Sequence, residues 1–181
     1  LSCDNLPSNG RTLKKLLGQV ATEIDRDLAR WIDETVAFPC SMVDRIVPAA
    51  TAADRAEIAQ RLGVEDAASV VGEPFTQWVV EDRFAAGRPD WHDVGVEFVD
   101  DVEPYERMKL RLLNGAHSTL AYLGYLAGHQ TIAAAANDDA LRALARGVMA
   151  ESAATLDGPA GVDLAQYRDA LIARFRNSAL P

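Results

Sequence analysis

The chain has 181 residues, of which 49% are hydrophobic, so it can bury the core of one domain or two small ones. Its formal charge is −9 and its pI is about 4.8, and Lys14-Lys15 is the only pair of adjacent lysines, which argues against a nucleic-acid partner. No stretch approaches the roughly 18 apolar residues of a membrane span. Cys3 and Cys40 form no CxxC pair, so we expect reduced thiols and a cytoplasmic location.

The first half of the chain alternates between helical and strand-like patterns. Apolar residues recur every three or four positions across 11–34, which predicts one helix. A short strand is expected over 41–48, closed by Pro48, and a helix over 51–62 that ends at Gly63. Residues 75–82 and 95–101 are rich in β-branched and aromatic side chains and predict two further strands.

After Pro104 only helical patterns remain. We expect a helix from 105 to about 128, a short one in "TIAAAA" (131–136), one that opens on Asn137 or Asp138, and one over 163–175. The sequence therefore predicts a mainly α protein with a smaller α/β part. The change in pattern sets a boundary between 1–103 and 104–181.

The segment "MKLRLLNGAHS" (108–118) carries an amine, an amide and an imidazole within an apolar helix. At about 100° per residue, Asn114 lies roughly 140° and His117 roughly 80° around the helix from Lys109. A lysine among apolar neighbours can act as a base, an amide can stabilise a developing oxyanion, and a histidine can orient a hydroxyl. Spacing alone nevertheless favours an ordinary arrangement, with Lys109 solvated and the other two side chains hydrogen-bonded to backbone.

Two further polar stretches have an ordinary and a functional interpretation. "SCDNLPSNG" (2–10), which includes Asn5, is typical of a turn. "MVDRI" (42–46) places Asp44 beside Arg45, either as a surface ion pair or as a carboxylate that steers a substrate hydroxyl. The histidines show no zinc-ligand spacing, and no complete GxGxxG turn is present, so we expect no metal and no dinucleotide cradle in these residues.

Several segments of uncommon composition resemble one family in the same order. They are "SCDNLPSNG", "FPCSMVDRIVP", "EPFTQWVVEDRFAAGRPDW", "DVEPYERMKLRLLNGAHSTLAYLGYLAG" and "LIARFRNSAL". Together they closely resemble the polyol-specific long-chain dehydrogenases, the family of mannitol 2-dehydrogenase and fructuronate reductase (mannonate oxidoreductase). The resemblance implies that 1–103 is the end of a nucleotide-binding domain and 104–181 a truncated helical substrate domain. It also implies that this chain is a slice of a longer enzyme, with the NAD-binding half largely missing.

The resemblance also implies roles for particular residues. The general base would be Lys109, the reacting oxygen would be held by Asn5 and Asn114, and His117 would complete the catalytic group. Asp44 would lie near the substrate, and Glu106 would exchange protons with solvent. With roles assigned to these six residues, the resemblance favours a catalytic interpretation of 108–118 over the ordinary one.

The implied reaction interconverts a secondary alcohol and a 2-keto group on a six-carbon polyol or sugar acid, mannonate/fructuronate or mannitol/fructose. It would use NAD and no metal. The expected partner is a small polyol, ketose or hexuronate, with no nucleic acid and no membrane, and the oligomeric state is left open, a monomer included. The alternative is a non-catalytic helical interaction module derived from such an enzyme. The joint presence of the proposed catalytic residues favours the enzyme, although the isolated fragment is expected to be inactive.

Overall fold

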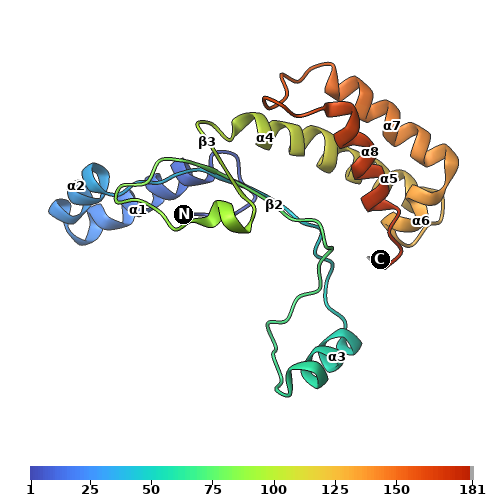
Figure 1. Cartoon of the computed structure of the whole chain (residues 1–181), viewed down its shortest axis with the longest axis horizontal. Coiled ribbons are helices and arrows are strands. Elements are labelled where there is room, and N and C mark those ends of the chain that lie inside the picture. Colours follow the sequence, from blue (N-terminus) through green and yellow to red (C-terminus); the bar gives the residue numbers. More distant parts are fainter. Residues whose placement is uncertain (180–181) are drawn as a thin grey trace. The chain divides into compact units, whose positions relative to one another are not determined.

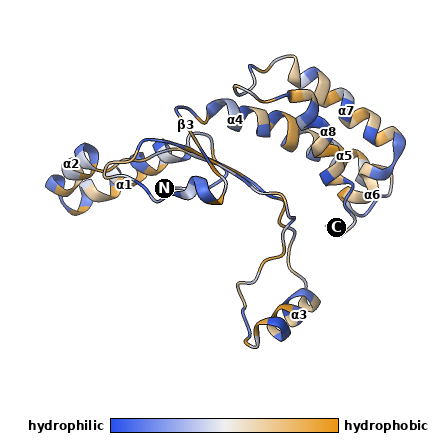
Figure 2. Ribbon diagram, in the orientation of Figure 1, coloured by the Kyte–Doolittle hydropathy of each residue, from blue (hydrophilic) through white to orange (hydrophobic). Residues whose placement is uncertain are grey.

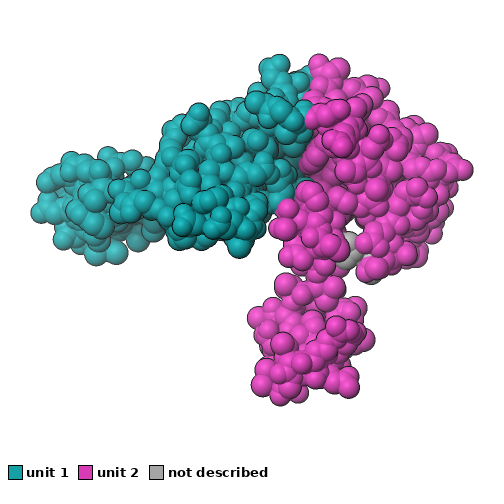
Figure 3. Space-filling view, in the orientation of Figure 1, with its two compact units in different colours: residues 1–44, 77–110, 155–162 teal, residues 45–76, 111–154, 163–181 magenta. Residues whose placement is uncertain are grey.

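The structure is a computed structural model that describes residues 1–179. The chain divides into two compact units (Figure 3). Unit 1 comprises residues 1–44, 77–110 and 155–162, and unit 2 comprises residues 45–76, 111–154 and those from 163 onward. Each unit is thus assembled from three separate stretches of the chain, and each is described by itself.

Unit 1 contains a three-stranded mixed sheet (Figure 1). The strands are β1 (Ser41–Asp44), β2 (Gln77–Glu81) and β3 (Val96–Val99). The central strand β2 runs antiparallel to β1 and parallel to β3. Val79 and Val80 on β2 are completely buried, as expected for β-branched residues in a central strand. A 3-10 turn, η1 (Trp91–Val94), leads into β3. All three expected strands are therefore present.

The first strand is shorter than predicted, because β1 ends at Asp44 and does not continue to Pro48. Just beyond it, the backbone N–H of Ile46 donates to the Glu73 carboxylate at 2.7 Å, and the Glu73 N–H donates to the Ile46 carbonyl at 3.1 Å. Beyond Asp44 the chain is thus hydrogen-bonded to Glu73, through its carboxylate and its backbone N–H. The pairing of β1 with β2 therefore ends at Asp44.

The single helix predicted over 11–34 is wrong, because two helices occupy this region. They are α1 (Asn9–Ile24) and α2 (Arg26–Thr35), which pack against each other. Between them Asp25 adopts an extended conformation, and its carboxylate accepts hydrogen bonds from the N–H groups of Asp27 and Leu28. An aspartate in this position caps the new helix. Large apolar side chains on both helices remain exposed, among them Val20, Ile24 and Trp31. Figure 2 shows hydrophobic positions along the ribbons of α1 and α2.

The predicted helix over 105–128 is also not one continuous α-helix. It consists of α4 (Glu103–Met108), a π-helical turn η2 (Lys109–Asn114) and α5 (Gly115–Leu126). In a π turn the hydrogen bonds join residues five apart, so the rotation per residue is smaller than in an α-helix. The angles of roughly 140° and 80° expected from a straight α-helix therefore do not apply. Among residues 1–179 no strand follows Val99, as predicted.

Unit 2 combines α3 (Ala52–Leu62) with a group of helices formed by α5, α6 (Ile132–Asn137), α7 (Asp139–Ala153) and α8 (Leu164–Phe175). The start and end of α3 agree with the prediction: Thr51 and Asp54 form a capping box, and Gly63 ends the helix with a φ of 74°. Of the two caps considered for α7, Asp138 is the one observed. Helix α5 packs on α6 and α7, and α7 packs on α8.

Small residues let two of these helices approach closely. A Cβ atom on Gly124 of α5 would lie 2.7 Å from the Cβ of Ala135 on α6, closer than two carbon atoms can pack. The core around them contains the fully buried Leu120, Ala145 and Leu171. This explains the small residues interleaved through "LAYLGYLAG" and "TIAAAA": they set the spacing between helices.

A buried ion pair joins α8 to the segment that carries α3. Arg174 donates to Glu73 through Nη2 at 2.6 Å and through Nε at 3.0 and 3.2 Å, and the two side chains are 10% and 3% exposed. The Arg174 guanidinium also lies 4.0 Å from the centre of the Phe75 ring. Because Arg45 Nε donates to the Glu73 carbonyl at 2.8 Å, the same glutamate residue fixes the chain immediately after β1.

Candidate functional site

Lys109 brings together three segments of unit 1 that are far apart in the sequence. It is the first residue of the π turn, and its Nζ donates to the Val43 carbonyl of β1 at 2.6 Å and to Oδ1 of Asn5 at 3.2 Å. The Asn5 amide comes from the N-terminal segment that precedes α1. π turns occur frequently at functional sites, because the widened turn displaces one residue from the regular helical position. An amine that contacts both a backbone carbonyl and a side-chain amide is a candidate proton donor or acceptor.

The segment that presents Asn5 is anchored by a second asparagine. Asn9, which is 2% exposed, donates through Nδ2 to the carbonyls of Ser2 (3.0 Å), Asp4 (3.0 Å) and Ser41 (2.8 Å). Its Oδ1 accepts the Ser41 N–H at 2.9 Å. All the hydrogen-bonding groups of one buried amide are thus satisfied, and they tie residues 2–4 to the start of β1. The turn-like segment 2–10 is therefore attached to the start of β1 through Asn9.

Glu106 lies one helical turn before Lys109, on α4. Both of its carboxylate oxygens accept the Ser8 N–H at 3.2 Å, and Ser8 has the left-handed φ of 50°. Burial raises the pKa of the Glu106 carboxyl above its ordinary value of 4.5, and the charges of Glu103 and Glu81 raise it further. The Ser8 N–H and the Arg11 charge act in the opposite direction. The net upward shift makes this carboxyl easier to protonate than a surface glutamate.

The other three predicted site residues occupy different environments. Asp44, at the end of β1, is 2% exposed, so its carboxylate is buried rather than on the surface. Asn114 is the half-buried last residue of the π turn. His117 is exposed on α5, with its ring 6.1 Å from that of Phe175.

The six residues do not all belong to one unit. Lys109, Asn5, Asp44 and Glu106 are part of unit 1, and Asn114 and His117 are part of unit 2. Within unit 1, Lys109 donates a hydrogen bond to Asn5, another predicted site residue.

Some contributors to this site could not be found from the sequence. The Val43 carbonyl and the Ser8 N–H are backbone groups. The residue type therefore does not indicate that they form hydrogen bonds at this site. Asn9 gives only a weak signal, because a second asparagine in a turn-like segment is typical of the turn itself. Among residues 1–179 no group of three or more His, Cys, Asp or Glu side chains could hold a metal ion. In the same range no helix combines the length and apolar character needed to cross a membrane.

Comparison with known proteins places the chain in a family. Residues 1–93 match the sequence model of the mannitol dehydrogenase Rossmann domain, and residues 101–181 match that of the mannitol dehydrogenase C-terminal domain. The chain thus matches a Rossmann domain model followed by a C-terminal domain model of the same family. The chain belongs to the mannitol dehydrogenase family.

Curated relatives and solved structures agree with this assignment. D-mannonate oxidoreductase of Escherichia coli is 53% identical over 181 residues, and mannitol 2-dehydrogenase of Aspergillus fumigatus is 42% identical over 185. Each match covers 99% of this chain and 37% of the relative. The chain therefore spans little more than a third of their length.

Two solved structures share the fold of nearly the whole chain. One is a substrate-free D-sorbitol dehydrogenase, with a TM-score of 0.90 and 39% identity over 99% of this chain and 37% of that one. The other is the ternary complex of Pseudomonas fluorescens mannitol 2-dehydrogenase with NAD and D-mannitol. It has a TM-score of 0.84 and 45% identity over 97% of this chain and 36% of that one.

Proposed function

We propose that this chain is the catalytic part of an NAD-dependent oxidoreductase that interconverts a secondary alcohol and a 2-keto group on a six-carbon polyol or sugar acid. Residues 1–103 form the end of its nucleotide-binding domain, and residues 104–181 belong to its helical substrate domain. The observation that carries the proposal is the position of the Lys109 amine between the Val43 carbonyl and the Asn5 amide. Relatives named for mannonate and for mannitol support the substrate class.

Lys109 acts as the general base. Its Nζ donates to the oxygens of Val43 and Asn5, and a lysine amine that has lost its proton has a lone pair that can accept one. The Lys109 nitrogen removes the proton of the substrate hydroxyl while the C–H hydrogen departs as hydride. A bound NAD would supply the acceptor for that hydride. No metal is needed for this step, because the amine and the amides carry the charge that develops.

The two asparagines stabilise the reacting oxygen. Because Oδ1 of Asn5 accepts from Lys109, the Nδ2 group of the same amide is oriented to donate to the substrate oxygen. Asn114 supplies a second amide donor, and such donors act most strongly when negative charge develops. His117 orients the substrate hydroxyl, and Asp44 steers a neighbouring one. Glu106, with its raised pKa, passes the proton from Lys109 towards solvent.

The test is Lys109→Ala in the full-length enzyme, assayed for NAD-linked oxidation of mannonate and of mannitol. We expect the rate constant to fall by about 10²–10⁴-fold, the usual contribution of a positioned general base. The control is Lys14→Ala, because Lys14 forms a surface pair with Asp33 (2.7 Å) and should leave the rate unchanged. A small primary amine added to Lys109→Ala should restore part of the rate.

The pH profile decides whether Lys109 is the base. In the wild type, alcohol oxidation should decrease on the acidic side as the base becomes protonated, and Lys109→Ala should lose this dependence. If the acidic limb persists unchanged in the variant, another residue is the base. Asn114→Ala should lower the rate constant without a matching loss of NAD affinity. Absence of NAD-linked oxidation in the wild type would instead support the non-catalytic interaction module.

A further inference from the structure

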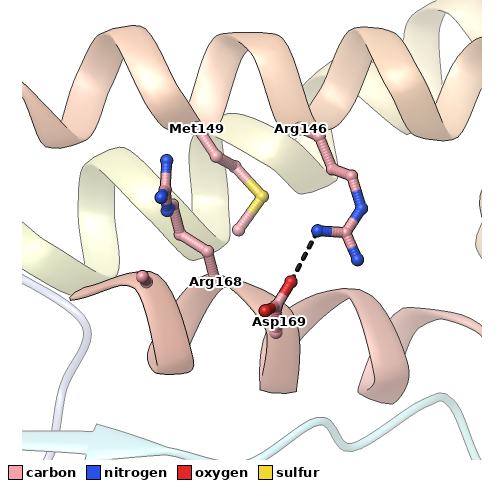
Figure 4. A pocket seen from close by; sticks show the side chains of 5 residues that line it. Arg146, Met149, Arg168 and Asp169 are labelled. Atoms are coloured by element: carbon pink, nitrogen blue, oxygen red, sulfur yellow. Dashed lines mark hydrogen bonds and ion pairs between the residues drawn. The ribbon is translucent and has the colours of Figure 1, made fainter. Parts of the chain in front are cut away.

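A small cavity lies between α7 and α8, within unit 2. Its volume is about 240 Å³, and it is lined by Arg146 and Met149 of α7 and by Ala165, Arg168 and Asp169 of α8. Figure 4 shows the two guanidinium groups on either side of the Met149 side chain, with Asp169 facing Arg146. Because a water molecule takes about 30 Å³ in the liquid, the cavity can hold a compact ion with some water but not a large metabolite.

One of the two arginines is already paired. Arg146 Nη1 donates to Asp169 Oδ1 at 2.5 Å, and these side chains are 50% and 66% exposed, so this ion pair is open to solvent. Exposed pairs of this kind contribute little to stability, because water competes for both partners. Arg146 can therefore bind a second anion in addition to the Asp169 carboxylate.

The second arginine has a donor without a partner. Nε of Arg168 is buried, and among residues 1–179 it makes no hydrogen bond. A buried donor left unsatisfied costs about 1–3 kcal/mol, which a ligand oxygen would recover on binding. Nε and one Nη of a guanidinium form a fork that matches two oxygens of a carboxylate or phosphate.

The local charge and the wall of the cavity favour an anion. Two guanidinium groups and one carboxylate give the lining a formal charge of +1. Met149 contributes an apolar side chain to the lining between the two guanidinium groups. We propose that this cavity binds a compact oxyanion, a free phosphate or small carboxylate, held mainly by Arg168 with Arg146 as the second contact.

The experiment is calorimetric titration of the intact protein with sodium phosphate and, separately, with succinate, at constant ionic strength. Saturable binding in either titration identifies the preferred oxyanion, and sodium chloride should give none. Arg168→Gln should weaken binding at least tenfold. Asp169→Asn should strengthen binding, because it removes the competing carboxylate and releases Arg146. Arg61→Gln is the control, because Arg61 is 77% exposed and pairs with Glu57 on the distant α3.

The two substitutions at the cavity predict opposite effects, so a folding defect in one cannot imitate the result. Circular dichroism should show wild-type helix content in both. Absence of saturable binding at millimolar phosphate and succinate would overturn the proposal and leave water as the occupant. Unchanged affinity in Arg168→Gln would also overturn it, because the anion would then bind elsewhere.

Discussion

The buried pair between Glu73 and Arg174 should dominate the stability of unit 2. Glu73→Gln keeps the size of the side chain but removes the negative charge that faces Arg174, which is only 10% exposed. Breaking one partner of a buried pair typically costs about 3–5 kcal/mol. Arg174 still faces the Phe75 ring at 4.0 Å, which supports the lower end, about 3 kcal/mol. For a chain of this length, that corresponds to a decrease in Tm of about 6–12 °C.

The measurement is urea unfolding followed by circular dichroism, with Glu57→Gln as the matched control. Glu57 pairs with Arg61 on the surface of α3, the side chains being 61% and 77% exposed, so the control should lose only about 0.3–0.5 kcal/mol. If Glu73→Gln loses no more than the control, the pair is not a major stabilising contact. The double variant Glu73→Met with Arg174→Met should recover much of the loss, because an apolar pair of similar volume needs no desolvation of charge.

Three further outcomes are expected. Burial raises the pKa of Glu106, so the folded state binds more protons than the unfolded state between pH 4.5 and the raised value. Stability should therefore fall as pH rises through that window, and Glu106→Gln should flatten this decrease in denaturant midpoints measured across it. Asn9→Ala should cost about 3 kcal/mol by urea unfolding, because it leaves buried groups such as the Ser41 N–H unpaired; a loss below the average of a single hydrogen bond would contradict its anchoring role. Gly10→Ala should destabilise α1, because the new Cβ would lie 2.5 Å from the backbone of residues 38 and 39. The control is Gly18→Ala, whose Cβ meets no atom within 4 Å and which should stabilise the folded state by up to about 1 kcal/mol. Equal Tm values for these two variants would show that the close contact at Gly10 is not constraining.

Local signals predicted most of the secondary structure. The helix at 51–62 was identified with its cap and its terminal glycine, because a capping box and a left-handed glycine depend on a few adjacent residues. Alternation and β-branching located all three strands. The break at Asp25 was missed because apolar periodicity continues across it, and a single extended residue changes the direction of the chain without changing the pattern.

Contacts between distant residues could not be predicted. Glu73 and Arg174 are 101 positions apart, and neither residue carries a local sign of its partner. The family resemblance, and not the spacing, assigns Lys109 the role of base, and one of its acceptors is the Val43 carbonyl, a group that every residue possesses. The π turn could not be predicted either, because its sequence, "KLRLLN", has ordinary helix propensity.

The π turn places one more residue between Lys109 and Asn114 than a regular helix needs for the same rotation. π-helical turns are rarer and less favourable than α-helical ones, so deletion of one residue within 109–114 would let the segment relax into a regular helix. Four α-helical steps of about 100° turn the chain by about as much as the five smaller steps of the π turn. The side chains from Asn114 onward would therefore keep nearly the same direction around the helix relative to Lys109. Homologous chains that lack one residue here should be expected to keep the alignment of these polar groups.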